Sequence, residues 1–166
     1  MGSTRPRGLT MTTTAVPETY RNAVIAHIMI EGARAAIDFY VEAFGAEELF
    51  CLNTPDGRIL HAEISVRGST IMLGDAEGPL FSAPTPVGGT NVALHVYVDD
   101  VDALTQRAVA AGAELLQAPA DQFHGDRTAM LRDPHGHVWI FLTHLEDLTP
   151  DEIARRARKM MSSPPA

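Results

Sequence analysis

The sequence predicts an α+β protein made of two copies of one unit, in which a strand and a helix are followed by three more strands. Residues 24–30 (VIAHIMI) resemble residues 92–98 (VALHVYV), at an offset of 92 − 24 = 68 residues. After each of these strands comes a helix-like segment that stops at a Gly-Ala-Glu sequence, which begins at Gly45 in the first copy and at Gly112 in the second. Because a single long offset relates two segments, the pattern indicates a duplicated module rather than a solenoid of short repeats.

A tight turn followed at once by an apolar strand marks the second copy, in residues 133–141 (DPHGHVWIF). Asp-Pro favours a turn, and Gly136 can adopt a positive φ without steric cost. Gly68 occupies the matching place in the first copy, since 136 − 68 = 68. The β-prone run after the turn predicts a buried strand, and side-chain alternation places Trp139 in the core under the helix layer.

The other elements follow from apolar spacing and from turn residues. Apolar residues at i, i+3, i+4 and i+7 predict a helix over residues 33–44, ended by Gly45. The capping sequence Thr149-Pro150-Asp151-Glu152 predicts a C-terminal helix with a narrow apolar stripe, which should pack on the body or on a partner chain. We also predict strands at 20–31, 47–53, 58–66, 70–74, 91–98 and 126–132, a helix at 101–111, a short strand beginning at Leu115, and a loop at 117–125.

These elements divide the chain into five segments. We predict a disordered tail at 1–19, the first module at 20–77, a Pro- and Gly-rich linker or flap at 78–90, the second module at 91–148, and a C-terminal helix and tail at 149–166.

Composition excludes several classes of partner. The 166-residue chain has a net charge of −8 and scattered basic residues, which argues against nucleic acid and against an anionic membrane surface. Cys51 is the single cysteine, so no intrachain disulfide can form, as is typical of the reducing cytoplasm. Since no segment resembles a signal peptide or a membrane span, we expect a cytoplasmic protein.

Several motifs together resemble the vicinal oxygen chelate superfamily, which unites glyoxalases, bleomycin resistance proteins and extradiol dioxygenases, and its PhnB-like branch in particular. The motifs are AIDFY at 36–40, FGA at 44–46, Gly57-Arg58 with His61-Ala62-Glu63, GDR at 125–127 and DPHGHVW at 133–139, and the resemblance covers about residues 20–148. It implies two βαβββ modules whose strands form a curved mixed sheet around a cavity, with the helices on the convex side. It also implies a homodimer in which the first module of one chain faces the second module of the other.

The same resemblance places the usual metal ligands on the first and last strands of each module. Counting from the motifs reaches Ile25 and Ile140, and the repeat offset adds Met72 and Ala93. None of these side chains offers the oxygen or nitrogen ligand that a hard or borderline divalent ion needs, so we predict no metal at the usual positions.

A displaced site remains an alternative. His27, His61, Glu63 and His95 should all face the cavity, and they could hold zinc, manganese or iron(II). The other interpretation is that these side chains line a ligand cavity or form a hydrogen-bond network, in which case the protein needs no cofactor.

The sequence therefore leaves open whether the protein is an enzyme. The first hypothesis is a protein that binds a small apolar or aromatic ligand, with sequestration of an antibiotic as one form of that role. The second is a metal-dependent lyase, isomerase or dioxygenase that uses the displaced cluster, and the third is metal-free acid–base chemistry by Glu63 with His61. The predicted ligand contacts are His27, Met29, His61, Glu63, Met72, Phe81, His95, Tyr97 and Phe123.

Overall fold

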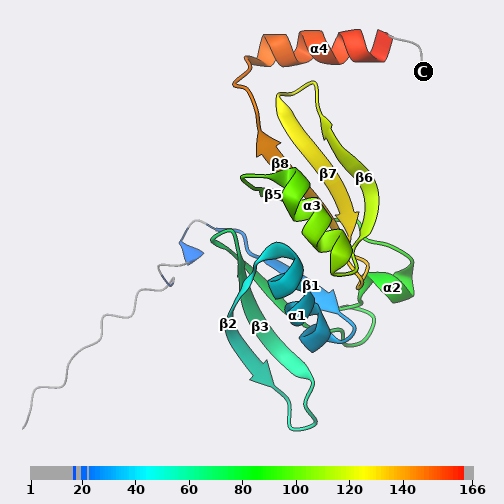
Figure 1. Cartoon of the computed structure of the whole chain (residues 1–166). Helices are drawn as coiled ribbons and strands as arrows, with labels where there is room; N and C mark the ends of the chain where they lie inside the picture. The colour runs from blue at the N-terminus through cyan, green and yellow to red at the C-terminus, as the bar shows by residue number, and fades with distance from the viewer. Residues whose placement is uncertain (1–16, 18–19, 22, 163–166) are drawn as a thin grey trace, which may run out of the picture.

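Two modules of the same plan make up the chain, which is described here from a computed structural model (Figure 1). The structure describes residue 17, residues 20–21 and residues 23–162, so the predicted tail lies almost entirely outside it. The first module comprises β1 (Ala26–Ile30), α1 (Ala33–Phe44), β2 (Glu47–Asn53), β3 (Ile59–Val66) and β4 (Ser69–Asp75). The second comprises β5 (Ala93–Tyr97), α3 (Val101–Ala110), β6 (Glu114–Asp121), β7 (Asp126–Arg132) and β8 (Val138–His144).

The strand registers confirm the duplicated α+β plan. The sheet orders are β1-β4-β3-β2 and β5-β8-β7-β6, so the first and last strands of each module pair in parallel. Ala26 pairs with Ile71 in the first sheet, and Leu94 pairs with Trp139 in the second. Both partners of the second pair lie 68 residues after those of the first, which is the offset found in the sequence.

Each helix covers one face of its own sheet, as predicted. On β3 the residues Ala62, Ile64 and Val66 are buried, whereas the intervening residues on the other face are only partly buried. α1 also packs against α3, and Arg107 Nε donates a hydrogen bond to the carbonyl oxygen of Ala43 at 2.8 Å. The two helices thus hold the modules together on the side opposite to the exposed sheet faces.

A buried carboxylate ties the modules together in the core. Asp133 Oδ2 accepts hydrogen bonds from the Tyr40 hydroxyl at 2.7 Å and from Trp139 Nε1 at 2.9 Å. Its Oδ1 accepts the backbone amides of His135 and His137, both at 2.9 Å. Burial, together with the Asp133 carboxylate, raises the pKa of Tyr40 well above its ordinary value. Trp139 is fully buried, so its predicted core position is confirmed.

Two predicted elements are wrong in extent. The first strand begins at Ala26 rather than at residue 20, because the chain before it turns through a hydrogen bond from the Tyr20 amide to the Pro17 carbonyl and leaves Val24 fully exposed. The predicted loop at 117–125 is largely strand, since β6 extends to Asp121 and pairs with β7 through two irregularities. Pro119 is compatible with this because β6 lies at the edge of its sheet, where a missing amide donor costs little.

The linker and the C-terminal helix lie outside the two sheets. The linker contains α2 (Pro84–Val87), and the Thr85 hydroxyl donates to the carbonyl of His135 in the turn of the second module at 3.3 Å. α4 (Pro150–Ser162) begins with the predicted cap, in which Thr149 Oγ1 accepts the Glu152 amide at 3.3 Å. None of its described residues is buried, and the helix stands beyond the second module (Figure 1). No helix in the described part of the chain is both long and apolar enough to cross a membrane.

Candidate ligand-binding site

A row of side chains crosses the face of the first sheet that the helix leaves open. His27 on β1 pairs with Met72 on β4, Met72 pairs with Glu63 on β3, and Glu63 pairs with Phe50 on β2. Because directly opposed residues share a face, these four side chains form one continuous strip. The structure therefore brings together three of the predicted ligand contacts and adds Phe50, which is half-exposed and was not predicted.

The polar end of this strip is a small hydrogen-bonded cluster. Glu63 accepts a hydrogen bond from the Tyr20 hydroxyl, and its Oε1 lies 3.3 Å from His61 Nε2. The rings of His61 and His27 meet edge to face, with 5.7 Å between their centroids. No motif or apolar spacing around Tyr20 indicated that its hydroxyl reaches Glu63, and for this reason sequence reasoning missed Tyr20.

The cluster fixes the charge of its members. The Tyr20 hydrogen bond, with a smaller contribution from His61, lowers the pKa of Glu63, so this carboxyl group is ionised at neutral pH. Partial burial, and then the nearby His61, lower the pKa of His27, so its imidazole is neutral there. The strip thus carries one carboxylate and one neutral imidazole beside Met72 and Phe50, and the ring of His61 lies next to both polar groups.

The linker closes one end of this face. Phe81 forms an isolated bridge with Glu77, and it lines a pocket of about 180 Å³ together with His27 and Met29. His27 and Met29 also line a larger cleft of about 700 Å³, which linker residues and His137 line as well. The predicted contacts His27, Met29 and Phe81 are therefore neighbours.

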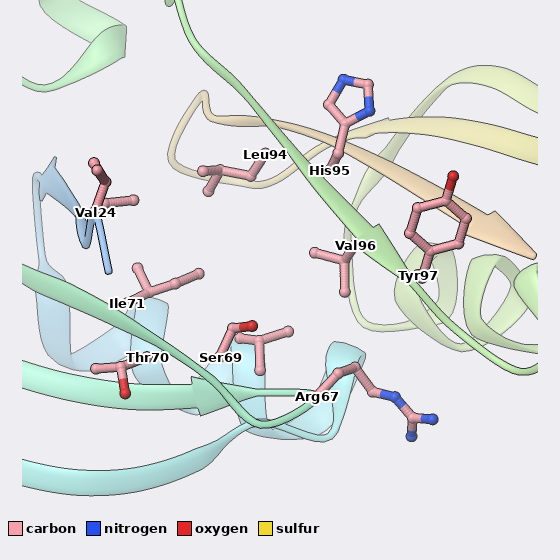
Figure 2. Close-up of a pocket in the computed structure, with 11 residues that line it drawn as sticks. Val24, Arg67, Ser69, Thr70, Ile71, Leu94, His95, Val96 and Tyr97 are labelled. Atoms are coloured by element: carbon pink, nitrogen blue, oxygen red, sulfur yellow. The ribbon is translucent and has the colours of Figure 1, made fainter. Parts of the chain in front are cut away.

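The second sheet carries the corresponding row. His95 pairs with Ile140, Ile140 with Met130, and Met130 with Gln117. Leu94, His95, Val96 and Tyr97 of β5 all line the groove between the modules, and Figure 2 shows Leu94 and Val96 on one side of the strand and His95 and Tyr97 on the other. This groove has a volume of about 420 Å³.

The four residues of the proposed displaced metal site are consequently divided between the sheets. His27, His61 and Glu63 lie on the first sheet, and His95 lies on the second. Within residues 17, 20–21 and 23–162, no three His, Cys, Asp or Glu side chains are grouped so that they could hold a metal ion. At the usual positions of the superfamily the side chains are those of Ile25, Met72, Ala93 and Ile140, which offer no oxygen or nitrogen donor and do not fit a hard or borderline divalent ion.

A second polar cluster, centred on the buried Asp126, lies at the far end of the second sheet. Asp126 accepts hydrogen bonds from the Tyr97 hydroxyl and from His144 Nδ1, both at 2.8 Å. His144 Nε2 lies 3.0 Å from Asp147 Oδ1. Burial acts to raise the pKa of Asp126, but the hydrogen bonds from His144 and Tyr97 outweigh it and the pKa is lowered. The two carboxylates in turn raise the pKa of His144.

Sequence reasoning identified Tyr97 and Phe123 here but not the anchor between them. Phe123 contacts the ring of His124, with 5.2 Å between centroids, and His124 Nδ1 lies 3.3 Å from Asp126 Oδ2. The motif Gly125-Asp126-Arg127 was the available signal, because it ends the turn that brings these groups together.

Comparison with known proteins assigns the family. The model of the Glyoxalase/Bleomycin resistance protein/Dioxygenase superfamily matches residues 22–141. The chain belongs to this superfamily. An uncharacterized protein of Mycobacterium tuberculosis, Rv0887c, is 42% identical over 135 residues, which cover 79% of each chain.

Solved structures of other proteins share the fold. TioX from Micromonospora sp. ML1 is 30% identical, with a TM-score of 0.58 over 76% of this chain and 99% of its own. A PhnB protein from Bacillus cereus is 19% identical, with a TM-score of 0.57 over 72% of this chain and 98% of its own, which shows the fold alone.

Proposed function

We propose that this superfamily member binds a small apolar or aromatic molecule, as a homodimer, between the open sheet face of the first module and that of the second module of a partner subunit. The observation that carries the proposal is the exposure of large aromatic side chains on the open sheet faces and in the linker beside the first of them, within the part of the chain that the structure describes. Phe50, Phe81 and Tyr97 are 49%, 51% and 58% exposed. Exposed apolar patches of this kind mark sites of ligand binding or association.

The packing of the helices supports a dimeric cavity. Since α1 contacts α3, the open faces of the two sheets are held edge to edge within one chain, with β1 and β5 bordering the groove between them. A second chain, related by a twofold axis, would place its second sheet over the first sheet of its partner, and vice versa. The two rows beginning at His27 and His95 would then form opposite walls.

The composition of these walls favours an apolar or aromatic ligand with a few polar groups. Met72, Met130 and Ile140 supply adaptable apolar surface, and Phe50 and Tyr97 supply ring faces. Anchors stand at both ends, with the ionised carboxylate of Glu63 on one sheet and the Asp126 cluster on the other. Ligand pockets typically combine such apolar walls with a few placed polar groups.

Sequestration of an antibiotic in the cytoplasm is the form of this function that we favour. The superfamily description includes bleomycin resistance proteins, and the apolar side chains at its usual metal positions suit binding better than metal-assisted chemistry. The single cysteine, Cys51, is a free thiol, in keeping with a reducing compartment.

A second candidate function rests on the adjacency of His27, His61 and Glu63. These side chains share one face but by themselves form no metal-binding group, so a metal-dependent lyase, isomerase or dioxygenase would need the partner's His95, from the facing wall of the dimer, to complete the site. Without a metal, Glu63 and His61 could still serve in acid–base chemistry, since 3.3 Å separates their side-chain atoms.

Three measurements test these functions. Elemental analysis of the untagged protein after supply of zinc, manganese or iron(II) should find less than stoichiometric metal. A panel of aromatic antibiotics and metabolites should contain compounds that raise the melting temperature in proportion to the logarithm of concentration. Sedimentation should give a dimer. About one metal ion per chain, lost in His95→Ala, would overturn the metal-free proposal and favour the enzyme.

A further inference from the structure

Tyr20 reaches the open face of the first sheet from the segment before β1. Its hydroxyl donates a hydrogen bond to Glu63 Oε2 on β3, 43 residues away along the chain. The described backbone hydrogen bonds of Tyr20 are local, from its own amide to the Pro17 carbonyl and from the Ala23 amide to its carbonyl. Val24, which lies between this turn and β1, is fully exposed. The described bond that holds Tyr20 to the sheet is therefore that of its hydroxyl group.

The carboxylate that receives this bond is arranged to accept from a hydroxyl group. Its other oxygen, Oε1, lies 3.3 Å from His61 Nε2. The Tyr20 hydrogen bond, with a smaller contribution from His61, lowers the pKa of Glu63, so the carboxyl group is ionised and accepts hydrogen bonds without donating any. A hydroxyl group that donates to an ionised acceptor forms a stronger bond than it forms with a neutral one. A negatively charged ligand would instead be repelled by Glu63.

Aromatic and thioether side chains flank this carboxylate. On the open face, Glu63 pairs with Phe50 on one side and with Met72 on the other. The Phe50 ring is half exposed, and its centroid lies 6.1 Å from that of the His61 ring. Planar rings pack favourably against aromatic and thioether groups. A ring that carries a hydroxyl group therefore suits the surroundings of Glu63 in both its apolar and its polar part.

We propose that Tyr20 occupies the place of a ligand, and that the ligand is an uncharged phenol whose hydroxyl replaces that of Tyr20 on Glu63. This inference rests on the function proposed above and names the chemical class of its ligand. Exchange of one hydroxyl for the other conserves the hydrogen bond to the carboxylate, so no acceptor is left unsatisfied. A segment with local backbone hydrogen bonds and an exposed side chain such as Val24 opens at low free energy, so Tyr20 can move aside.

Tyr20 in this way sets both the affinity and the selectivity of the site. While its hydroxyl occupies Glu63, only molecules in which Tyr20 has moved aside can bind, and the apparent dissociation constant rises accordingly. If Tyr20 is in place in about nine molecules of ten, this constant is raised about tenfold. An aromatic ether has no hydroxyl to replace the bond that it breaks, so it displaces Tyr20 poorly.

Binding of p-cresol, which is the tyrosine side chain as a free molecule, tests this competition. Calorimetry or ligand-observed NMR compares the full wild-type chain with Tyr20→Ala and with Val24→Ala, a matched truncation at an exposed position of the same segment. The dissociation constant of p-cresol should be about tenfold lower for Tyr20→Ala than for wild type and unchanged for Val24→Ala. Adding Glu63→Gln to Tyr20→Ala should raise it again about tenfold, because a neutral amide accepts more weakly than a carboxylate.

Three relatives of p-cresol test the selectivity for a phenol. The methyl ether has no donor, p-toluate carries a negative charge and p-methylbenzylamine carries a positive one. Each should bind Tyr20→Ala at least about tenfold more weakly than p-cresol does. Tighter binding of the amine would show that Glu63 selects cations, and tighter binding of the ether would show that it selects no polar group, so either result overturns the phenol class.

Tyrosine-ring NMR of the wild-type chain supplies a readout that needs no truncated variant to fold. The chain has three tyrosines, and the conservative change Tyr20→Phe assigns the Tyr20 signal. Millimolar p-cresol should shift this signal towards that of free tyrosine, whereas the signal of the buried Tyr40 should stay in place. A Tyr20 signal that does not move when p-cresol is bound overturns the competition.

The thermal-shift panel separates failure of this inference from failure of the proposed function. If p-cresol binds neither wild type nor Tyr20→Ala, or binds both equally, the phenol inference is wrong. The proposed function still stands in that case if aromatic compounds without a hydroxyl raise the melting temperature of the wild-type chain. If no aromatic compound raises it, with or without a hydroxyl, both proposals fall together.

Discussion

Replacing Asp133 by Asn should destabilise the whole chain, because this carboxylate connects the two modules. Oδ2 accepts two buried donors, from Tyr40 and Trp139, and Oδ1 accepts two backbone amides. Asn keeps the shape but has one oxygen, so in either orientation its amide group faces two donors. A hydrogen bond to a charged group contributes about 1.5–3 kcal/mol, so the loss of two predicts a cost of at least roughly 3 kcal/mol. For a chain of this size the melting temperature should fall by roughly 6–12 °C.

Urea unfolding of Asp133→Asn and of a matched control checks this reasoning. Asp38→Asn removes an exposed carboxylate 3.7 Å from Arg34 on α1 and should cost less than about 0.5 kcal/mol. Tyr40→Phe removes one of the donors to Asp133, so the double variant should cost less than the sum of the two single changes. If Asp133→Asn costs less than about 1 kcal/mol, or if its effect simply adds to that of Tyr40→Phe, the carboxylate does not hold the modules together in the way described.

Three further predictions concern the site and the turn beside it. Phe81→Ala should raise the dissociation constant of an aromatic ligand roughly tenfold, measured by thermal shift or calorimetry, whereas Leu80→Ala, which is 82% exposed, should leave it unchanged. The pKa of His144, followed by NMR, should lie above 6.5 and should return towards 6.5 in Asp126→Asn. Because the pKa of His144 is raised in the folded protein, its interaction with Asp126 and Asp147 stabilises the fold fully below about pH 6.5, and this stabilisation is lost as the pH rises through the folded pKa. Gly125→Ala should lower the melting temperature, because Gly125 has φ +94° and an added Cβ would lie 2.6 Å from the Glu146 carbonyl oxygen; an unchanged melting temperature would mean that this turn relaxes freely.

Apolar periodicity, together with the turn and capping residues, predicted most of the fold. α1 and β2 have the predicted bounds, and Asp100 caps α3 by accepting the Ala103 amide at 2.9 Å. Such elements are set by neighbours in sequence, such as Gly45 with its φ of 69° at the end of α1. The prediction of a loop at 117–125 was wrong because Pro119 favours a loop locally, whereas β6 forms as a strand through its pairing with β7. The edge position that permits this proline is a property of the sheet, not of the segment.

For the candidate site, the sequence could predict which strand face each side chain lies on but not which side chains contact one another. Alternation placed His27, His61, Glu63 and Tyr97 on the open side, but it could not show that Tyr20 reaches Glu63 across 43 residues of sequence. The same limit hid Asp126, which becomes an anchor only when β5 and β8 bring Tyr97 and His144 beside it. Side-chain periodicity reports which residues share a face, whereas a polar cluster depends on distances between strands that no single segment encodes.

The two polar clusters imply that the binding face is asymmetric although the backbone is duplicated. The counterpart of Tyr97 at the repeat offset is Met29, since 97 − 68 = 29, and the counterpart of His144 is Ala76. Neither side chain can reproduce the Asp126 cluster. The polar group that could hold a ligand is therefore Glu63 on the first sheet and Asp126 on the second, and the two do not occupy equivalent positions along their strands. In a twofold dimer each cavity would then contain one anchor of each kind. A ligand with a donor at one end of an apolar body and an acceptor at the other would be held in one orientation. Glu63 accepts hydrogen bonds, whereas His144 Nε2 could donate one to the ligand in place of its present bond to Asp147.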